Sequence, residues 1–264
     1  MKQIDSSANS RFKALLRLVE SSRERKKAGR SVLDGVHLIA AYQEQAGKPE
    51  QLAVSRQGLV NPEIRALLDG MKGVDTVVLS DTLFKMLSSV LTPTGILAVV
   101  ETPRPQPVPR DLDTCVMLED LQDPGNLGSI LRSCAAAGVR NVLLSAGSVH
   151  AWSPRVLRAA MGAHFALAIH EGVDLQAAAR GYAGKRVATQ QRALRTLFET
   201  DLTGRVALLL GNEGAGLSAG LLAAADTVVS VPMPGRAESL NVAAAAAVCL
   251  FERIRQLGAA ALKK

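Results

Sequence analysis

The residues of this chain that could do chemistry gather in three loops of its C-terminal half, each lying between a predicted strand and a predicted helix. The first loop belongs to residues 118–132, where a turn of Asp, Pro and Gly leads into a helix. Asn126 stands near the helix entrance, where an amide side chain can cap backbone N–H groups. Arg132 follows in the second turn of the helix. Taken alone, this segment predicts a helix cap and a surface arginine.

The second loop is rich in glycine and carries an acid. Residues 206–217 read VALLLGNEGAGL, so Gly211 and Glu213 directly follow a buried strand. Glycine lets a ligand approach the backbone closely, although a plain turn before a helix has the same composition. The GxGxxG dinucleotide fingerprint and the GxxxxGK(S/T) phosphate loop are both absent from the sequence. Their absence argues against a nucleotide-dependent dehydrogenase, which is the alternative class of enzyme.

The third loop, residues 231–242, reads VPMPGRAESLNV and begins with Val231 at the end of a predicted strand. Ser239 is placed to cap the long final helix, with Leu240 and Asn241 in the first turn. Taken alone, this segment is an ordinary helix start. In parallel α/β sheets, however, ligands bind at the edge where strands end and helices begin. We therefore expect the three loops to meet at one edge of a sheet.

The elements that must hold these loops follow from apolar patterning. In the second half of the chain, continuous apolar runs predict strands covered on both faces, which are typical of a parallel sheet. These runs span residues 115–118, 141–144, 166–169, 206–210 and 227–231. Helices are expected at 128–137 and 240–257, and Gly138 stands where the first of them stops. The pattern predicts an α/β domain.

The first half of the chain alternates helical and strand patterns. Apolar residues at helical spacing predict a helix over 9–24, opposite a basic face. Short strands are expected at 51–55, 76–79 and 96–100, and helices at 62–68 and 81–87. Proline at every second position from 103 to 109 predicts an extended linker. The chain therefore divides into a smaller α/β domain at 1–100, a linker at 101–111 and a second α/β domain at 112–264.

Positive charge is concentrated at the start of the chain. The formal net charge is +7, and the first thirty residues hold nine lysines and arginines against three acids. A concentrated basic face suggests a polyanionic partner, and nucleic acid is the commonest one; a solvated helix face is the alternative. Aromatic residues make up only 3%, so phosphate contacts and shape recognition fit better than base stacking. The candidate RNA-binding residues are Arg11, Lys13, Arg23, Lys26, Lys27 and Arg30.

Several other features narrow the class of protein. Cys115, Cys134 and Cys249 lie far apart and form no CxxC pair, which predicts buried thiols rather than disulfides or a zinc site. The four histidines have no ligand spacing, so we expect no metal. No stretch reaches the roughly 18 consecutive apolar residues of a membrane helix. The first residues show no apolar signal region. We therefore expect a cytoplasmic protein that contacts no membrane.

Together, the three loops resemble the motifs of the SpoU/TrmH family of RNA ribose 2′-O-methyltransferases, within the SPOUT superfamily. Asn126 and Arg132 match its first motif, and residues 211–216 match its GxEGxG loop. The third motif, a PM-containing strand end followed by SLNV, matches residues 232–233 and 239–242. Residues 29–35 and 92–98 resemble the L30e-like RNA-binding domain of the members that act on ribosomal RNA.

The resemblance implies a trefoil knot in the second domain, an L30e-like first domain, a homodimer formed through the catalytic domain, and S-adenosyl-L-methionine as cofactor. The residues implied to bind this cofactor are Thr189, Gly211, Val231 and Leu240. The implied catalytic residues are Asn126, Arg132, Glu213, Ser239 and Asn241. Arg132 would act either as a base or as a group that holds phosphate and stabilises an alkoxide; the first role is awkward, since arginine pKa values exceed about 12. Ribosomal RNA is the expected substrate, with transfer RNA or a non-catalytic ribosome-associated role as alternatives.

Overall fold

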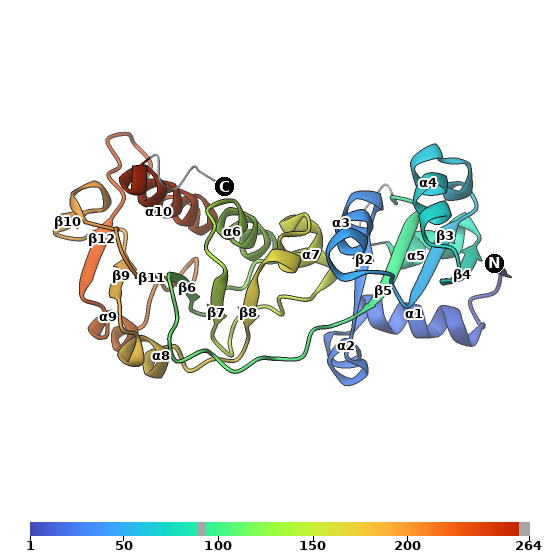
Figure 1. Cartoon of the computed structure of the whole chain (residues 1–264), viewed down its shortest axis with the longest axis horizontal. Helices are drawn as coiled ribbons and strands as arrows, with labels where there is room; N and C mark the ends of the chain where they lie inside the picture. The colour runs from blue at the N-terminus through green and yellow to red at the C-terminus, as the bar shows by residue number, and fades with distance from the viewer. Residues whose placement is uncertain (89–92, 259–264) are drawn as a thin grey trace. The chain divides into compact units, whose positions relative to one another are not determined.

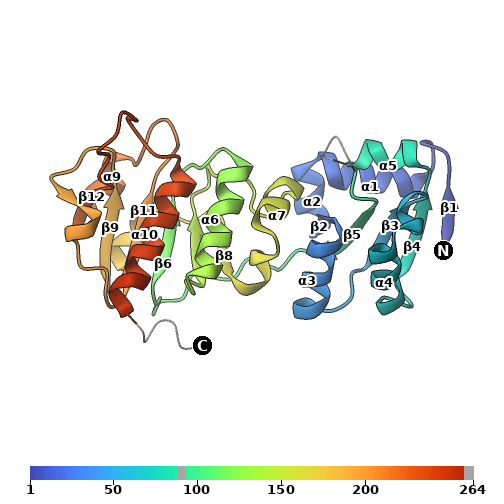
Figure 2. The ribbon, with the colours of Figure 1, turned by 90° about the horizontal axis from the view of Figure 1, so that it is seen from above.

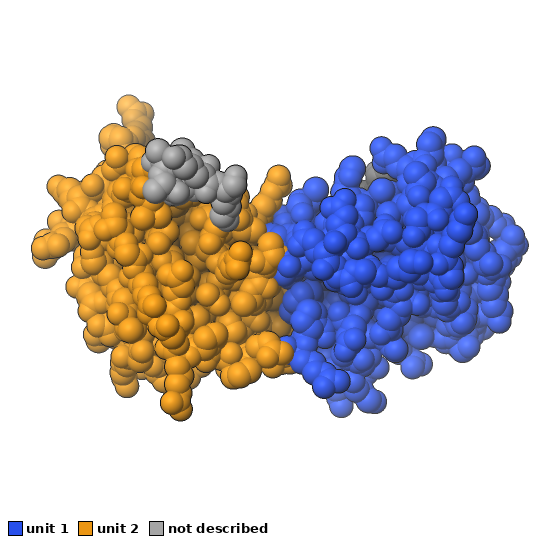
Figure 3. Space-filling view, in the orientation of Figure 1, with its two compact units in different colours: residues 1–104, 152–165 blue, residues 105–151, 166–264 orange. Residues whose placement is uncertain are grey.

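The computed structural model describes residues 1–88 and 93–258, and the chain folds into two compact units (Figure 1, Figure 3). The first unit holds residues 1–104 and 152–165, and the second holds residues 105–151 and 166–264. The alternating prolines belong to a segment that forms neither helix nor strand. The sequence analysis divided the chain at residues 100 and 112 and gave each part a role. This division and these roles stay predictions. Thr92, in one of the segments that resemble the L30e-like domain, lies outside the described residues.

The first unit is built on a five-stranded sheet of order β1-β4-β3-β5-β2. Its strands are β1 (Lys2–Ile4), β2 (Arg30–Asp34), β3 (Gln51–Ser55), β4 (Asp75–Leu79) and β5 (Ile96–Glu101). β1, β3 and β4 run parallel, whereas β5 is antiparallel to both β3 and β2. The three strands predicted here are confirmed, and β1 and β2 add to them. The carboxyl ends of β3 and β4 consequently lie at the edge where β5 begins.

Helices cover both faces of this sheet (Figure 2). The helices of this unit are α1 (Ser10–Glu20), α2 (Ser22–Ala28), α3 (Val36–Ala46), α4 (Pro62–Gly70), α5 (Asp81–Leu87) and α7 (Pro154–Ala160). On one face, Phe12 and Leu15 of α1 and Phe84 of α5 join one buried cluster with the strands. α3 and α4 contact each other on the opposite face (Figure 2). α7 contacts β2, which is why its segment groups with the first unit although it follows β7 (Asn141–Leu144) in the chain.

The single helix predicted for 9–24 is wrong, because the chain forms two helices that are broken at Ser21. Ser21 has an extended backbone, and its hydroxyl accepts a hydrogen bond from an N–H of α2, so it caps that helix. Arg25 reaches back to the end of α1. Its guanidinium donates to the carbonyl oxygens of Leu18 and Val19 at 2.7 and 2.9 Å. Because the last carbonyls of a helix lack partners within it, this buried arginine stabilises the break.

Arg25→Ala is expected to destabilise the protein by about 1–3 kcal/mol, because two partly buried carbonyl oxygens lose a charged donor. Arg23→Ala is the matched control, since Arg23 is exposed and has no partner among the described residues. Urea unfolding of the full chain measures both. Equal stability of the two variants would show that water replaces the guanidinium at the end of α1.

The second unit contains a seven-stranded sheet of order β10-β12-β9-β11-β6-β7-β8, in which every neighbouring pair is parallel. With β7, its strands are β6 (Cys115–Leu118), β8 (Ala168–His170), β9 (Lys185–Thr189), β10 (Arg195–Thr196), β11 (Val206–Leu210) and β12 (Thr227–Ser230). The predicted parallel sheet is therefore confirmed. The strand expected at 166–169 starts two residues later, because Ala163–Ala166 forms a short 3₁₀ helix.

Helices also cover both faces of this second sheet. They are α6 (Pro124–Ala136), α8 (Leu175–Gly181), α9 (Ala219–Ala223) and α10 (Val242–Leu257). α6 and α10 contact each other on one face, and α8 and α9 lie on the other (Figure 1). Leu175 of α8 packs in one cluster with Cys115 and Met117 of β6. Cys115, Cys134 and Cys249 are buried and unpaired as predicted, and burial raises the pKa of each thiol to about 12.

The strands of the second unit end together at one edge. Leu118, the last residue of β6, pairs with Leu210 of β11 on one side and with Leu144 of β7 on the other. Thr189, the last residue of β9, pairs with Val229 of β12. The loops that follow these strands therefore leave from the edge where parallel α/β sheets bind ligands. The trefoil knot depends on how these loops thread and stays a prediction.

Candidate active site

The first loop is anchored by a helix cap. Asp123 is the N-cap of α6, and its carboxylate accepts a hydrogen bond from the backbone N of Asn126 at 2.7 Å. Pro124 occupies the first helical position, where its missing N–H costs nothing. The capping role predicted for Asn126 is therefore wrong, because Asp123 already performs it. The amide side chain of Asn126 remains available for contacts outside its own helix.

That amide joins the three loops. Its Nδ2 donates to Oε1 of Glu213 at 3.0 Å, and its Oδ1 accepts a hydrogen bond from Nδ2 of Asn241 at 2.8 Å. The three residues are separated by 87 and 115 positions in the sequence, so only the fold brings them together. The predicted convergence of these loops at the sheet edge is confirmed for these three side chains.

Asn241 has a second role, since it caps α10. Its Oδ1 accepts hydrogen bonds from the backbone N of Ala243 at 2.9 Å and of Ala244 at 3.3 Å. The prediction that Ser239 caps this helix is wrong, because the helix begins two residues later than expected. An amide suits this place better than a hydroxyl: it offers an oxygen to the helix and a nitrogen to Asn126. The start of α10 is thereby tied to the first loop.

The carboxylate of Glu213 is held by three donors. Besides the amide of Asn126, the backbone N–H groups of Gln122 and Asp123 donate to it at 3.4 and 3.3 Å. Partial burial works to raise its pKa, but the hydrogen bonds outweigh burial and lower the pKa below the ordinary value. Glu213 is therefore ionised at neutral pH, and it fixes the loop that follows β6.

The lowered pKa of Glu213 predicts a dependence of stability on pH. A carboxyl whose pKa is lower in the folded state stabilises the fold above its unfolded value of 4.5, and this stabilisation is lost as the pH falls through the folded pKa. Glu213→Gln should therefore lower the melting temperature at pH 7, and the difference from wild type should shrink below about pH 4.5. Glu238→Gln is the matched control, since no hydrogen bond to that carboxylate occurs among the described residues. If the melting temperatures of wild type and Glu213→Gln differ by the same amount at every pH, the carboxyl of Glu213 does not have a lowered pKa in the folded state.

The glycine-rich loop folds back on itself. Asn212 and Gly216 exchange two backbone hydrogen bonds, of 3.0 and 2.9 Å, and the side-chain oxygen of Asn212 accepts from the backbone N of Gly214 and Ala215. Gly211 lies against this turn so closely that a Cβ there would be 2.2 Å from the carbonyl carbon of Gly216. Gly211 is therefore required by the loop's own packing, whatever a ligand demands.

Gly211→Ala is expected to force this loop apart and to abolish cofactor binding, because the added methyl group meets backbone that cannot move aside. Gly235→Ala is the control, in the loop that follows β12 and outside the lining of the cavity described below. A Cβ at Gly235 would meet nothing within 4 Å. Calorimetric titration of both variants with S-adenosyl-L-methionine distinguishes them; equal affinities would contradict the packing argument.

A cavity of about 520 Å³ opens at this edge, among the loops that follow β9, β11 and β12 and the start of α10. The four predicted cofactor-binding residues all line it: Thr189, Gly211, Val231 and Leu240. Three of the predicted catalytic residues line it as well: Glu213, Ser239 and Asn241. Asn126 contacts two of these residues without lining the cavity itself. The geometry assembles one site from segments far apart in the chain, while the roles of these residues stay predictions.

Comparison with known proteins identifies the family. Residues 113–251 match the model of the SpoU rRNA methylase family, and residues 9–98 match the MRM3-like substrate binding domain. The chain belongs to the SpoU rRNA methylase family. Both the resemblance read from the three motifs and the separate N-terminal domain are thereby confirmed.

Relatives of this SpoU methylase match it along nearly its whole length. It is 33% identical to the 23S rRNA (guanosine(2553)-2′-O)-methyltransferase RlmP of Bacillus subtilis, covering 95% of this chain and 98% of the relative. It is 30% identical to the 23S rRNA (uridine(2479)-2′-O)-methyltransferase of Streptomyces viridochromogenes, with coverages of 95% and 91%. The crystal structure of the SpoU methyltransferase AviRb from the same species, in complex with AdoMet, is 30% identical, with a TM-score of 0.83 and coverages of 95% and 99%.

Arg132 stands apart from the cavity of this SpoU methylase. It lies in the third turn of α6, one turn later than expected, because the helix begins at Pro124. Its side chain is exposed, makes no hydrogen bond or ion pair within the described residues, and does not line the cavity. The single chain therefore leaves this guanidinium open to solvent and to a substrate.

The six candidate RNA-binding residues of this SpoU methylase fall into two groups. Arg11 makes a two-pronged ion pair with Asp75 at 3.2 and 2.9 Å, and Arg30 pairs with Glu50 at 2.6 Å. The other four are exposed and have no ion pair in the part of the chain that the structure describes: Lys13, Arg23, Lys26 and Lys27. Arg25, in the same basic stretch, is buried and serves the helix break instead. Among the six candidates, the charge that is open to a polyanion therefore lies in α1 and α2.

Asp120 is a site residue that the sequence reasoning missed. Its φ of +52° is in the left-handed region, which few residues other than glycine adopt. Its backbone oxygen accepts from the amides of Gln122 and Asn212 at 3.0 and 2.7 Å, and its carboxylate accepts from the hydroxyl of Ser145 at 2.6 Å. Asp120 thus links the loops that follow β6, β7 and β11. Nothing in the local sequence marks this conformation, because it depends on partners in the other two loops.

Two charged residues of the cavity wall, Arg192 and Glu238, were also missed. Arg192 lies outside the three motif loops, and Glu238 lies between the two parts of the third motif, which does not include it. Within residues 1–88 and 93–258, no group of three or more His, Cys, Asp or Glu residues could hold a metal ion. No helix in those ranges is long and apolar enough to cross a membrane.

Proposed function

We propose that this chain is an S-adenosyl-L-methionine-dependent methyltransferase that modifies a ribose 2′-hydroxyl of ribosomal RNA. The observation that carries the proposal is the hydrogen-bonded contact of Glu213, Asn126 and Asn241 beside the cavity at the sheet edge. Both full-length relatives are named for 2′-O-methylation of 23S rRNA, which favours ribosomal RNA over transfer RNA. The complete set of motif residues argues against a non-catalytic RNA-binding protein.

The cavity suits S-adenosyl-L-methionine in size and lining. Its volume of about 520 Å³ is within the range of about 300–1,000 Å³ typical of small-molecule sites. Val231, Met233 and Leu240 offer apolar contact to a purine, while the carboxylates of Glu213 and Glu238 complement a positive sulfonium. When bound, this cofactor supplies an electrophilic methyl group. The AdoMet complex of AviRb supports the same cofactor for this chain.

The residues of the chain must orient the ribose and handle the charge of its 2′-hydroxyl, which loses a proton during transfer. Glu213, Asn126 and Asn241 hold the three loops in one arrangement, and Ser239 lines the cavity beside them. We assign to Arg132 the binding of the adjacent phosphate and compensation of the developing alkoxide. A guanidinium offers five N–H donors in one plane and recognises phosphate well.

The first unit is assigned to RNA binding. It contains the match to a substrate binding domain and the exposed, unpaired bases of α1 and α2. Phosphate contacts of this kind give affinity that falls steeply with salt concentration. The family resemblance supports a homodimer formed through the catalytic domain, and three buried, unpaired thiols suit a reducing cytoplasm.

The test is incubation of the purified chain with deproteinised ribosomal RNA and methyl-labelled S-adenosyl-L-methionine, followed by mapping of 2′-O-methylated nucleotides. The expected result is label at one or a few ribose positions of ribosomal RNA. Transfer RNA serves as the parallel substrate. Label in transfer RNA alone would overturn the choice of substrate, and RNA binding without any label would support the non-catalytic alternative.

A further inference from the structure

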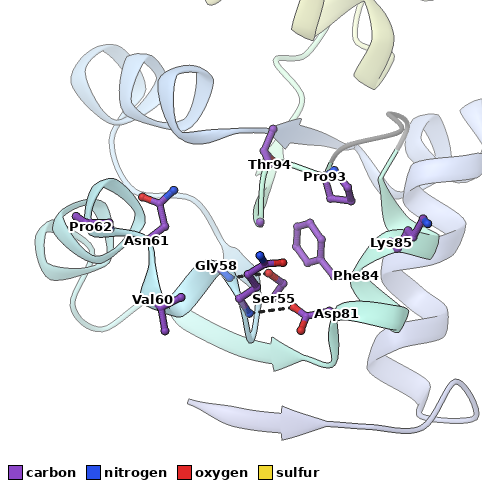
Figure 4. A pocket seen from close by; sticks show the side chains of 12 residues that line it. Ser55, Gly58, Val60, Asn61, Pro62, Asp81, Phe84, Lys85, Pro93 and Thr94 are labelled. Atoms are coloured by element: carbon purple, nitrogen blue, oxygen red, sulfur yellow. Dashed lines mark hydrogen bonds between the residues drawn. The ribbon is translucent and has the colours of Figure 1, made fainter.

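The first unit has a cavity of its own, far from the three motifs in sequence (Figure 4). Its volume is about 500 Å³, and the described residues that line it fall within 55–62, 81–85 and 93–95. These segments follow β3, follow β4 and precede β5, so the cavity lies at the carboxyl edge of the parallel strands. This edge is where parallel α/β sheets bind ligands.

The floor of this cavity is fixed by packing and hydrogen bonds. A Cβ at Gly58 would be 2.4 Å from the carbonyl oxygen of Gly95, so the two glycines bring their segments into direct contact. The hydroxyl of Ser55 accepts a hydrogen bond from the N of Gly58 at 2.8 Å. The carboxylate of Asp81 accepts one from the N of Gln57 at 2.9 Å (Figure 4). The cavity is therefore a built feature that exists before any ligand enters.

The apolar wall suits the face of a planar ring. Phe84 is only 1% exposed and belongs to the core beneath the cavity, but Pro93 at the wall is half-buried and Val60 at the rim is 64% exposed (Figure 4). Val60 therefore offers an apolar contact to a ring that enters the cavity.

The polar wall offers donors for a base edge and for a phosphate. The side-chain oxygen of Asn61 caps α4, which leaves its NH₂ group without a hydrogen-bond partner among the described residues. The side chain of Gln57 also lines the cavity and makes no hydrogen bond there within the described ranges. Lys85 is exposed at the rim, and the structure gives it no ion pair in those ranges.

We propose that this cavity receives one unpaired nucleotide of the RNA substrate. The base lies against Val60 and Pro93, its edge meets the amides of Gln57 and Asn61, and Lys85 contacts its phosphate. A paired base is stacked inside a helix and cannot enter such a cavity, so the nucleotide must come from a loop or bulge. The proposal rests on the RNA substrate of the proposed function, and it places recognition of that RNA in the first unit.

Crosslinking locates the contact directly. The full chain is bound to two 23S rRNA transcripts, one substituted with 4-thiouridine and one with 6-thioguanosine, irradiated, and analysed by mass spectrometry. Adducts are expected on peptides that contain residues 55–62 or 81–85. Adducts confined to other parts of the chain, such as α1 and α2, would overturn the proposal.

A matched pair of lysine variants measures the contribution to affinity. Lys85→Gln should weaken binding of 23S rRNA by about fivefold or more at 0.15 M salt, since one phosphate contact is lost. Lys72→Gln removes the same charge from the opposite edge of the sheet, before β4, and should change affinity by less than about twofold. At saturating RNA, Lys72→Gln should methylate at the wild-type rate.

The two proposals fail in different ways. If wild type methylates ribosomal RNA but Lys85→Gln binds that RNA as tightly as Lys72→Gln does, the cavity does not receive a nucleotide and the enzyme assignment stands. If no methylation occurs but Lys85→Gln alone loses affinity and the crosslinks fall at the cavity, the enzyme assignment fails and the cavity stands as an RNA site.

Discussion

Arg132→Ala is expected to lower methyl transfer by about 100- to 1,000-fold, the loss typical of removing a group that stabilises developing charge. The fold should be unaffected, because the Arg132 side chain is exposed and makes no hydrogen bond or ion pair within the described residues. Steady-state methylation of ribosomal RNA, with the melting temperature and S-adenosyl-L-methionine affinity measured alongside, checks both expectations. Cofactor affinity should match wild type, since Arg132 does not line the cavity.

Two further variants define what Arg132 does. Arg140→Ala removes another exposed arginine of the same unit, just after α6, and should leave the rate within about twofold, as a surface change does. Arg132→Lys keeps the charge but not the planar fork of donors, so it should recover part of the rate if the role is charge compensation. Turnover of Arg132→Ala close to that of Arg140→Ala would remove Arg132 from the mechanism.

The sequence predicted best those elements whose residues are buried from end to end. β6, β7 and β11 were placed without error because both of their faces are covered and every position is apolar or nearly so. β9 was missed as a strand because it opens with Lys185 and Arg186. Their charged ends are satisfied by Asp201 and Asp226, from other segments of the fold. No local pattern can report such partners, which is why strands with charged residues are harder to predict.

The candidate site shows the same limit at the level of single residues. The right residue types were found, but both helix caps were assigned to the wrong member of a group that could cap. Asp123 caps α6 in place of Asn126, and Asn241 caps α10 in place of Ser239. The choice is made by tertiary contacts: Asn126 is drawn to Glu213, and Asn241 to Asn126. Capping statistics describe one helix at a time and cannot contain this information.

The break between α1 and α2 has a related cause. Apolar spacing correctly identified the buried side of α1, including Phe12 and Leu15. Continuity of the helix depended on Ser21 and Arg25, either of which is acceptable inside a helix. Only together, as a cap for the second helix and a donor to the first, do they make the break favourable.

Asn241→Asp is expected to separate the two roles of that residue. Aspartate caps helices as well as asparagine does, so α10 should keep its start and the melting temperature should fall by less than it does in Asn241→Ala. In the native chain, Nδ2 of Asn241 donates to Oδ1 of Asn126 at 2.8 Å. In the variant, an oxygen takes the place of that nitrogen and faces Oδ1 of Asn126. If the amide of Asn126 turns over to donate to the new carboxylate, its oxygen faces the carboxylate of Glu213 instead. Either orientation leaves two acceptors in contact.

Because Asn241 is exposed, loss of this hydrogen bond costs about 0.5–1.5 kcal/mol. If the site needs the first and third loops in contact, kcat/KM falls by about two- to twelvefold. Asn241→Ala is the comparison, because it removes the cap as well and should cost about 1 kcal/mol of stability in addition. Methylation kinetics and thermal unfolding of both variants distinguish the capping role of Asn241 from its hydrogen bond to Asn126. Wild-type kcat/KM in Asn241→Asp would show that the hydrogen bond to Asn126 is dispensable, and the contact between the first and third loops would then be structural only.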